Sequence, residues 1–313
     1  MIEFRQVELH WRQRFESVFR KEEDRGCEYT FGNVYIWKDY YATQIALLDD
    51  SEIIVRFNRQ VEGYLFPCGI RDLQRTIEQM ITDSEQRAKA FRLVAVSSAD
   101  VEQLQQLFPG RFLFSANRDF SEYVYNSSDL IQLAGKRYHS KRNHISRFIS
   151  EYPDYTFEEI TPENIREVQN MSEQWYKEAL SARLDESLIQ EKTATDNAIR
   201  DHFRLGFSGL LIRAAGRVIA FAMGEPVNDR TFCVHIEKAL SEINGAYAII
   251  NRDYAAHFCP EYAFINREDD VGQQGLRRSK LSYHPAYLID KYIVTLAQDP
   301  FKENINDQTR NRG

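Results

Sequence analysis

The sequence has few cysteines and no group of closely spaced metal ligands. Its 313 residues include four cysteines and seven histidines, without a Cys-x-x-Cys pair and without the histidine spacing that binds zinc. We therefore expect no metal site and thiols that stay reduced, which is typical of a cytoplasmic protein.

Excess positive charge and long apolar runs are also absent. Lysine and arginine number 40 against 47 aspartates and glutamates, a net charge of −7. This balance argues against a protein that covers DNA or an anionic membrane through its overall field, so any nucleic-acid contact must be local. No segment reaches the roughly 18 apolar residues of a membrane span, and the charged N-terminal stretch lacks the apolar core of a signal peptide. We expect a soluble protein whose contact with a membrane is at most peripheral.

The length and hydrophobic content are sufficient for two domains. Hydrophobic residues make up 43% of the chain, enough for two cores of about 150 residues each. Periodicity and turn residues predict the same order of elements in both halves. The first half has a helix over 6–20, strands over 40–48, 51–58 and 62–67, a helix over 71–90, a strand over 92–98, a helix over 99–108 and a strand over 111–126. The second has helices over 161–179 and before residue 206, strands over 209–215, 217–225 and 231–239, a helix over 245–258, a strand over 262–266, a helix within 271–280 and a strand over 286–296.

This order is that of a GNAT-type (acyl-CoA N-acyltransferase) domain, present twice in tandem. The predicted fold is α+β, with two GNAT-like domains that each contain a mixed, mainly antiparallel sheet flanked by helices. We place the domains at 1–128 and 153–300, with a basic connecting helix over 129–152 and a frayed tail over 301–313.

Positive charge is concentrated in the connecting segment. Its sequence DLIQLAGKRYHSKRNHISRF (129–148) contains five cations and no carboxylate after Asp129. On a helix Arg137 and Lys141 share a face, which suits contact with phosphates, although a solvated helix face is the alternative. The candidates for phosphate contact are Lys136, Arg137, His139, Lys141 and Arg142.

Three long stretches carry a resemblance to a known family, namely LAGKRYHSKRNHISRF (133–148), HIEKALSEINGAYAIINRDYA (235–255) and INREDDVGQQGLRRSKLSYHPAYLIDKY (265–292). Together with YTFGNVYIWKDYY (29–41), they resemble the family related to the C-terminal domain of phosphatidylglycerol lysyltransferase, over nearly the whole chain. The resemblance implies kinship with Fem-type peptidoglycan aminoacyltransferases. It also implies aminoacyl-tRNA as a co-substrate, no tightly bound cofactor, and tRNA as a partner of the basic segment. The membrane-embedded part of the lysyltransferase has no counterpart in these residues, so the acceptor, a lipid or another compound, stays open.

The donor site of a GNAT domain lies where the fourth strand ends and the next helix begins. Here that place is EINGAYA (242–248), and the CoA pattern Q/R-x-x-G-x-G/A reads Glu242-x-x-Gly245-x-Tyr247. A tight pyrophosphate cradle is therefore not expected, which weakens acetyl-CoA as the donor. Gly245 is alternatively a turn residue. Asn251, one turn beyond Tyr247, could donate a hydrogen bond to a ligand.

Acyl transfer needs a base and a proton donor, and three residues are candidates for these catalytic roles. His235 and Glu237 project from one face of a predicted strand, where they could deprotonate the acceptor, although a solvated sheet face is the alternative. Tyr283 lies where related folds often keep a proton donor for the leaving group.

The stretch EDDVGQQGLRRSKLSY (268–283) is acidic at its start and basic toward its end. Carboxylates after the fifth strand could hold a cationic amine, and the following cations could bind phosphate. The helix dipole alone would also favour this order of charges. The candidates for substrate or donor binding are Asn266, Glu268, Asp269, Asp270, Arg277, Arg278 and Lys280.

The sequence thus predicts an acyltransferase that uses aminoacyl-tRNA and an amine or hydroxyl acceptor. One alternative is a CoA-dependent N-acyltransferase that takes acetyl-CoA or another acyl-CoA and a small amine. The other is a non-catalytic tandem module that binds RNA or a protein through residues 136–147.

Overall fold

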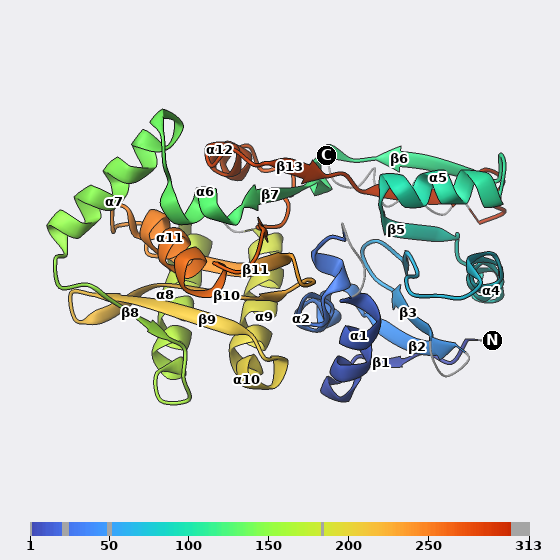
Figure 1. Cartoon of the computed structure of the whole chain (residues 1–313). Helices are drawn as coiled ribbons and strands as arrows, with labels where there is room; N and C mark the ends of the chain where they lie inside the picture. The colour runs from blue at the N-terminus through green and yellow to red at the C-terminus, as the bar shows by residue number, and fades with distance from the viewer. Residues whose placement is uncertain (1, 21–24, 49–51, 183–184, 302–313) are drawn as a thin grey trace.

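The computed structural model describes residues 2–20, 25–48, 52–182 and 185–301, which form two lobes side by side, each built on a mixed sheet (Figure 1). The strands described in the first sheet run in the order β1 (Arg5–Gln6), β2 (Gln44–Leu48), β3 (Glu52–Phe57), β4 (Gly63–Leu65), β5 (Arg92–Val96), β14 (Tyr292–Leu296) and β6 (Phe112–Ala116). Those of the second run in the order β13 (Tyr287–Ile289), β7 (Glu122–Asn126), β12 (Phe264–Asn266), β11 (Thr231–Ala239), β10 (Arg217–Pro226), β9 (Ser208–Ala214) and β8 (Thr156–Glu159). The pairs β4–β5 and β11–β12 are parallel, and the other described pairs are antiparallel. The predicted α+β fold with two GNAT-like units is confirmed.

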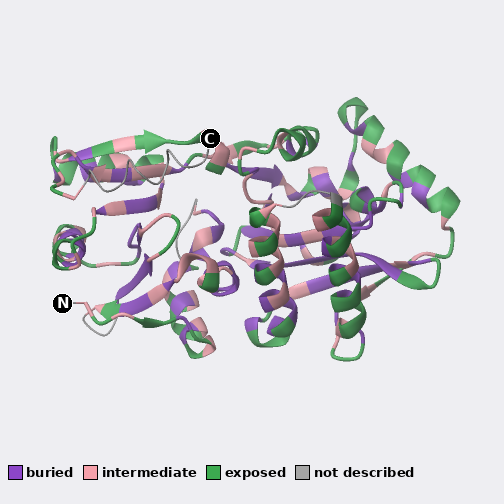
Figure 2. Cartoon of the chain, turned by 180° about the vertical axis from the view of Figure 1, so that it is seen from behind, coloured by how far each residue is buried: buried purple, intermediate pink, exposed green. Residues whose placement is uncertain are grey.

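Helices cover both sheets. The first half contributes α1 (Arg12–Phe19), α2 (Phe31–Ile36), α3 (Lys38–Tyr41), α4 (Leu73–Gln86) and α5 (Ser98–Leu107). The remainder contributes α6 (Ser127–Gln132), α7 (His139–Glu151), α8 (Ile165–Ala182), α9 (Glu186–Arg200), α10 (His202–Leu205), α11 (Ala246–Phe258) and α12 (Gln274–Leu281). Helix α11 packs on β9, β10 and β11, while α8 and α9 lie together on the opposite face (Figures 1 and 2).

The central strands of the second sheet form its core because helices cover both of their faces. Residues 218–225 of β10 are buried without interruption, and Figure 2 shows the buried strands behind helices whose outer faces are exposed. A strand covered on both sides reads as a continuous apolar run, which explains the sequence VIAFAM at 218–223. The alanines of α11 are small enough to let this helix approach the sheet closely.

Two predicted strands are each divided between the sheets. The predicted strand over 111–126 breaks at a short 3-10 turn, Arg118–Phe120, so that β6 stays in the first sheet and β7 enters the second. The predicted strand over 286–296 breaks likewise: β13 pairs with β7, while β14 inserts between β5 and β6. Ser121 donates a hydrogen bond to Asp290 across the two breaks at 2.9 Å. Each half therefore completes the sheet of the other, and the domain limits at 128 and 153 remain a prediction.

The connecting segment is two helices where one was predicted. Helices α6 and α7 are separated at residues 133–138, and the guanidinium of Arg142 holds this bend by donating to the carbonyls of Leu133 and Gly135 at 2.5 and 2.7 Å. Helix α7 then packs on α11. Of the predicted tail over 301–313, residues 302–313 lie outside the described part of the chain.

Helix α2 joins the lobes. All six of its residues are buried, and it contacts α9, where Asn197 donates to the carbonyl of Ile36 at 3.1 Å. Thr30 begins the helix, because its hydroxyl accepts a hydrogen bond from the N–H of Asn33 at 3.3 Å. Gly32 lets the helix approach the second sheet, since a Cβ there would collide with the side chain of Glu225. The stretch at 29–41, which resembles the family, therefore forms part of the interface between the two lobes.

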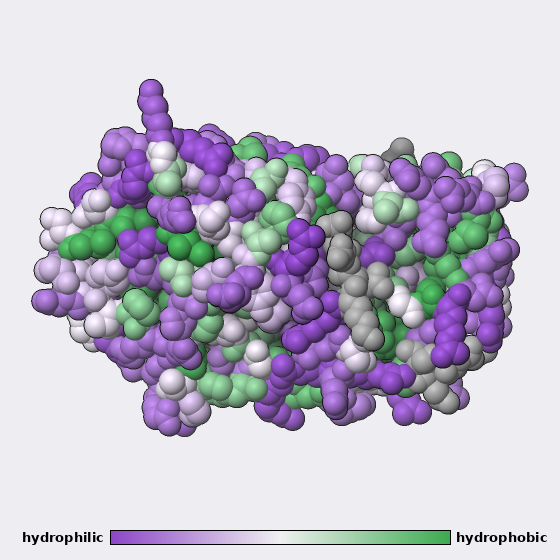
Figure 3. All heavy atoms as spheres, in the orientation of Figure 1, coloured by the Kyte–Doolittle hydropathy of each residue, from purple (hydrophilic) through white to green (hydrophobic). Residues whose placement is uncertain are grey.

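The described surface is mainly hydrophilic on the face that Figure 3 shows, with a hydrophobic area at the left over α7 and α11. Among the described residues, no helix combines the length and the apolar character that crossing a membrane requires.

Candidate functional site

A cavity of about 1030 Å³ lies between the two lobes. Strands β11 and β12 pair only from Thr231 to Cys233, so the sheet opens beyond this point and β11 continues along the cavity. Residues of α2 and the loops of the first half line one side, and β11, the start of α11, α7, α9 and α12 line the other. The cavity is therefore formed where a GNAT sheet splays, and both halves contribute to it.

Glu237 lies on β11 within a polar network at the cavity wall. Its carboxylate accepts a hydrogen bond from Arg267 at 2.8 Å and one from the side-chain amide of Asn251 at 3.2 Å. Asn251 does not line the cavity; it is buried and positions Glu237 from α11. The Arg267 guanidinium in turn lies 5.0 Å from the ring centroid of Tyr283. The network thus connects two of the predicted catalytic residues.

Tyr283 and Lys141 face each other in the same cavity. The Lys141 ammonium lies 3.8 Å from the ring centroid of Tyr283. Burial and the charge of Arg267 lower the pKa of Lys141 to about 8, against the opposing effect of Glu237. Burial raises the pKa of Tyr283 to about 12, and its hydroxyl has no hydrogen-bond partner among the described residues. At neutral pH the Tyr283 hydroxyl therefore keeps its proton, and a minority of the Lys141 side chains are neutral.

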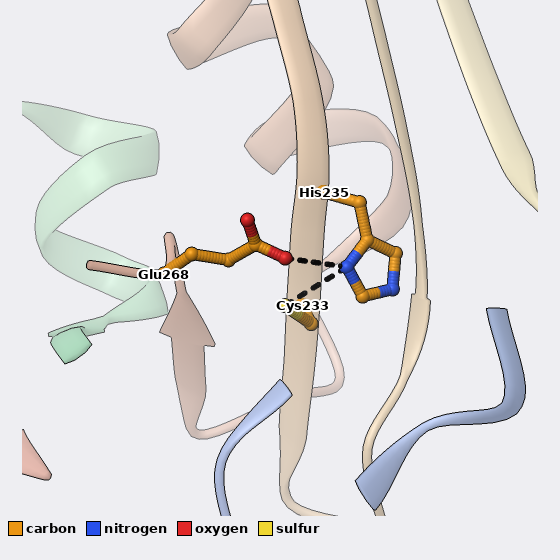
Figure 4. A group of neighbouring side chains, drawn as sticks. All are labelled: Cys233, His235 and Glu268. Carbon is orange, nitrogen blue, oxygen red and sulfur yellow. Dashed lines mark hydrogen bonds and ion pairs between the residues drawn. The ribbon is translucent and has the colours of Figure 1, made fainter. Parts of the chain in front are cut away.

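His235 is fully buried and held at both ring nitrogens. Its Nδ1 lies 2.8 Å from Glu268 and its Nε2 lies 3.1 Å from Glu225, with Cys233 Sγ 3.5 Å from Nδ1 (Figure 4). Burial alone would lower the pKa of His235, but Cys233 and the two glutamates together raise it well above its ordinary value. A ring that donates from both nitrogens has no lone pair with which to accept a proton. The role of His235 as a base stays a prediction that this arrangement does not favour.

The four predicted polar residues at the end of β12 and directly after it fall into two groups. Glu268 and Asp269 line the cavity, and burial raises the pKa of Asp269 to about 6. Asn266 and Asp270 are fully buried beneath it. Asn266 donates to Glu122 and accepts from the N–H of Glu268 at 2.8 Å, so it shapes the turn.

Most of the predicted phosphate-binding cations of α12 form ion pairs or hydrogen bonds within the protein. Arg277 bonds Asp270 through two nitrogens, each at 2.8 Å, and Asp119 at 2.7 Å, so neither Arg277 nor Asp270 is free to bind a ligand. Lys280 is buried and donates to the backbone carbonyls of Arg267 and Asp269. Arg278 is exposed and does not line the cavity. The charge order of this stretch therefore stabilises the turn before and within α12.

Gly245 and Tyr247 line the cavity at the start of α11, as predicted for the donor corner. Gly245 has φ of +84°, and a Cβ there would lie 2.5 Å from the carbonyl oxygen of His144. Only glycine permits this turn with α7 packed against it. Tyr247 accepts a hydrogen bond from the indole of Trp175 at 3.2 Å.

The basic segment contributes one of its five predicted residues, Lys141, to the cavity, together with His144. Arg142 holds the bend at 133–138, and Arg137 pairs with Asp129 at 2.9 Å. Lys136 and His139 are exposed near the start of α7, the latter 3.2 Å from Asn143.

One further polar cluster was not predicted, because its members come from distant parts of the chain. The Lys291 ammonium lies 2.5 Å from Glu28 and 2.5 Å from Glu122. Glu122 begins β7 and Lys291 directly precedes β14, where the chain passes between the two sheets. Glu122 also accepts from the N–H of Cys27 at 3.0 Å. Burial raises the pKa of Glu28 to about 7 despite Lys291. Glu28 and Lys291 line the cavity opposite β11, so the site is charged on both sides.

Comparison with known proteins agrees with this architecture. Residues 19–295 match the family described as phosphatidylglycerol lysyltransferase, C-terminal. The crystal structure of a conserved protein of unknown function from Bacteroides thetaiotaomicron is 36% identical, with a TM-score of 0.90 over 95% of this chain and 100% of that chain. The structure of L-PGS from Bacillus licheniformis is 15% identical and has the same fold, with a TM-score of 0.64 over 95% of this chain and 96% of that chain.

A further relative, an uncharacterized protein of Mycoplasmoides gallisepticum, is 28% identical over 177 residues. That match covers 56% of this chain and 56% of the relative, about half of its length. The family match, in contrast, extends over both sheets and includes the residues that surround the cavity. The chain therefore belongs to the family of the phosphatidylglycerol lysyltransferase C-terminal domain.

Proposed function

We propose that this protein transfers an aminoacyl group from aminoacyl-tRNA to an amine or hydroxyl acceptor. Family and fold indicate an acyltransferase, and the family description specifies a lysyltransferase. The observation that carries the finer proposal is that one cavity joins Lys141 of the basic segment with Glu237 and Tyr283. Cationic, acidic and proton-donating groups thus face one space that is large enough for a donor end and an acceptor.

The tRNA would approach along α7. Lys136 and His139 are exposed near the start of this helix, and Lys141 and His144 follow at the cavity. Hydrophilic side chains project over the same region in Figure 3. Phosphates could therefore contact the exposed cations while the esterified 3′ end enters the cavity. Because the net charge of the chain is −7, this contact with tRNA would be confined to the basic segment. The reaction would take place in the cytoplasm, where aminoacyl-tRNA occurs.

The transfer itself requires no covalent enzyme intermediate. The acceptor nitrogen or oxygen attacks the ester carbonyl carbon, the bond from that carbon to the ribose oxygen breaks, and the ribose hydroxyl leaves. Tyr283 would supply the proton to the leaving oxygen, since its pKa near 12 keeps it protonated. Neutral Lys141, whose pKa is about 8, would take the proton of the acceptor, and Glu237 would position Arg267 near the developing negative charge.

An acyl-CoA donor has less support at the same corner. A pyrophosphate would follow the turn at Gly245, where the backbone of α7 occupies the space in which a Cβ of residue 245 would lie. Glu242, which stands where the CoA pattern has a cation or amide, pairs with Arg217 at 3.1 Å. We therefore rank acetyl-CoA second as donor.

The test is transfer of labelled amino acid from a mixed aminoacyl-tRNA pool, combined with filter binding across a salt series. We expect salt-sensitive retention of charged tRNA that is weakened by Lys136→Glu together with His139→Glu. The control is Lys89→Glu, an exposed lysine of the first half that does not line the cavity, which should bind like the wild type. Acetyl-CoA is tested in parallel by thermal shift.

Two results would contradict the proposal. Stabilisation by acetyl-CoA without retention of tRNA would favour the CoA-dependent enzyme. At a concentration of acetyl-CoA one hundred times its Kd, this stabilisation would be about 2.7 kcal/mol. Retention of tRNA without any transfer, and with no effect of Tyr283→Phe on any turnover, would favour an RNA-binding module.

A further inference from the structure

Three potential metal ligands meet where β11 and β12 part. Cys233 and His235 are two residues apart on β11, where the pairing with β10 skips His235, and their side chains lie close together. Glu268 follows β12 and turns toward them (Figure 4). The His235 Nδ1 atom lies 2.8 Å from the Glu268 carboxylate and 3.5 Å from Cys233 Sγ, and the three ligand atoms lie within 4.8 Å of one another. The 3.5 Å separation is close to that between a sulfur and a nitrogen ligand of one tetrahedral zinc ion, and the 2.8 Å separation is a hydrogen bond that would lengthen when both atoms bind the ion.

The surroundings of His235 orient Nδ1 toward this point. Its other nitrogen, Nε2, lies 3.1 Å from Glu225, which is buried and opposite Cys233 on the neighbouring strand. Glu225 is itself held by the N–H of Gly32 at 2.8 Å. A histidine that binds a metal commonly donates its other N–H to a carboxylate, which fixes the tautomer and the ring plane. Glu225 provides this contact.

A second group of potential metal ligands consists of Cys27, Glu28 and Glu122. It differs from the group at His235 because a lysine already lies within it. The ammonium of Lys291 lies between its two carboxylates at 2.5 Å from each and neutralises them. The group at His235 has no lysine or arginine within ion-pair distance among the described residues. Among the described residues, the first group therefore has no cation other than the His235 ring itself, whereas the second already holds the Lys291 ammonium.

We propose that Cys233, His235 and Glu268 bind a zinc ion, which displaces the thiol proton of Cys233 and the Nδ1 proton that His235 shares with Glu268, so that His235 coordinates through Nδ1. One thiolate, one imidazole and one carboxylate form a donor set that suits zinc rather than magnesium or calcium, which prefer oxygen ligands alone. Three protein ligands leave one tetrahedral position for a water or another oxygen ligand. Because the Glu268 side chain is partly exposed at the cavity, a ligand bound at that position would come from the space in which a substrate would lie. This inference does not depend on the nature of the acyl donor.

The test is metal binding by the full chain, without any assay of transfer. Chelator-treated protein is titrated with zinc against a chromophoric indicator, and with cobalt(II) as a spectroscopic probe. We expect one ion per chain and a near-ultraviolet thiolate-to-cobalt charge-transfer band. Cys233→Ser should abolish the band and weaken zinc binding by more than the roughly 10- to 100-fold expected for Glu225→Gln, which should keep the band.

The matched control is Cys259→Ser, since Cys259 is also a buried, free thiol of the second lobe and lies outside the group. It should bind zinc like the wild type. X-ray absorption of the zinc-loaded wild type provides a second measurement if Cys233→Ser does not fold, and should show one sulfur ligand with nitrogen and oxygen ligands. Less than one ion per chain, absence of a sulfur ligand, or a charge-transfer band that survives in Cys233→Ser would overturn the assignment.

Discussion

Replacement of Lys291 by methionine should destabilise the fold much more than loss of an exposed ion pair. The Lys291 side chain is 8% exposed, and its ammonium lies 2.5 Å from both Glu28 and Glu122. Its removal leaves the buried Glu122 carboxylate without a cation, which costs about 3–5 kcal/mol. The pKa of Glu122 shows the same stabilisation of its charged form. Burial alone would raise this pKa, but Lys291 and the hydrogen bonds from Cys27 and Asn266 lower it to about 2.

The same interaction predicts a dependence on pH. Because the folded-state pKa of Glu122 is depressed, its contribution is present above the unfolded value of 4.5 and is lost as the pH falls toward 2. In Lys291→Met the carboxylate is buried without its cation and should protonate at a higher pH than in the wild type. The difference in unfolding free energy between the two proteins should therefore shrink as the pH is lowered from about 7 to about 3.

Urea unfolding followed by tryptophan fluorescence measures both effects. The control is Lys89→Met, because Lys89 pairs with Glu62 at 3.0 Å while the two side chains are 51% and 38% exposed. That variant should lose no more than about 1 kcal/mol. Adding Glu122→Gln to Lys291→Met should recover part of the loss, because the fully buried charge of Glu122 is removed and only the partly exposed Glu28 then lacks its cation. A loss below about 1 kcal/mol for Lys291→Met, or one that does not change with pH, would refute the reasoning.

Three further predictions concern the cavity and its frame. Tyr283→Phe should lower the transfer rate about 100-fold while leaving the Tm unchanged, because its hydroxyl has no described partner within the protein; an unchanged rate would remove Tyr283 from the mechanism. The wild-type rate should rise with pH as Lys141 loses its proton near pH 8, and Lys141→Met should lose this rise in a pH–rate profile, whereas an identical profile would exclude Lys141 as the base. Arg277→Met should lower the unfolding free energy measured in urea, because the buried Asp270 would keep only Arg118, at 3.6 Å, as a cation, yet folded protein should retain charged tRNA as the wild type does; weakened retention would show that Arg277 contacts the donor.

Much of the fold was predictable because most strands and helices have a local signal, although β1, β8, α2 and α3 were not predicted. The apolar run at 218–223 and the glycine before α11 identify a covered strand and a strand-to-helix turn without knowledge of neighbouring elements. The exchange of β7 and β14 has no such signal, since a strand carries the same alternation whichever sheet it joins. The breaks at residues 117–121 and 290–291 become visible only with the partner strands in place.

Candidate residues were predictable by type and less so by role. Glu237 and Tyr283 border the cavity as their positions in a GNAT-like order suggested. Arg277 and Asp270 have the composition of ligand-binding groups but bond to each other, because residues seven apart across a turn can form an ion pair that sequence spacing does not reveal. Cys233 was set aside for want of a nearby cysteine, although its neighbours in space are a histidine and a glutamate.

The sequence by itself determined the α+β tandem, the local concentration of positive charge at 129–148 and the family, because periodicity, charge pattern and long motifs are properties of contiguous residues. Only the tertiary structure decided which side chains share the cavity, which charges neutralise each other and which stay open to a ligand. These depend on distances between residues that are far apart in the chain, as with Lys291 and Glu28, and on burial, which makes one carboxylate a buried structural partner and another a cavity-lining group.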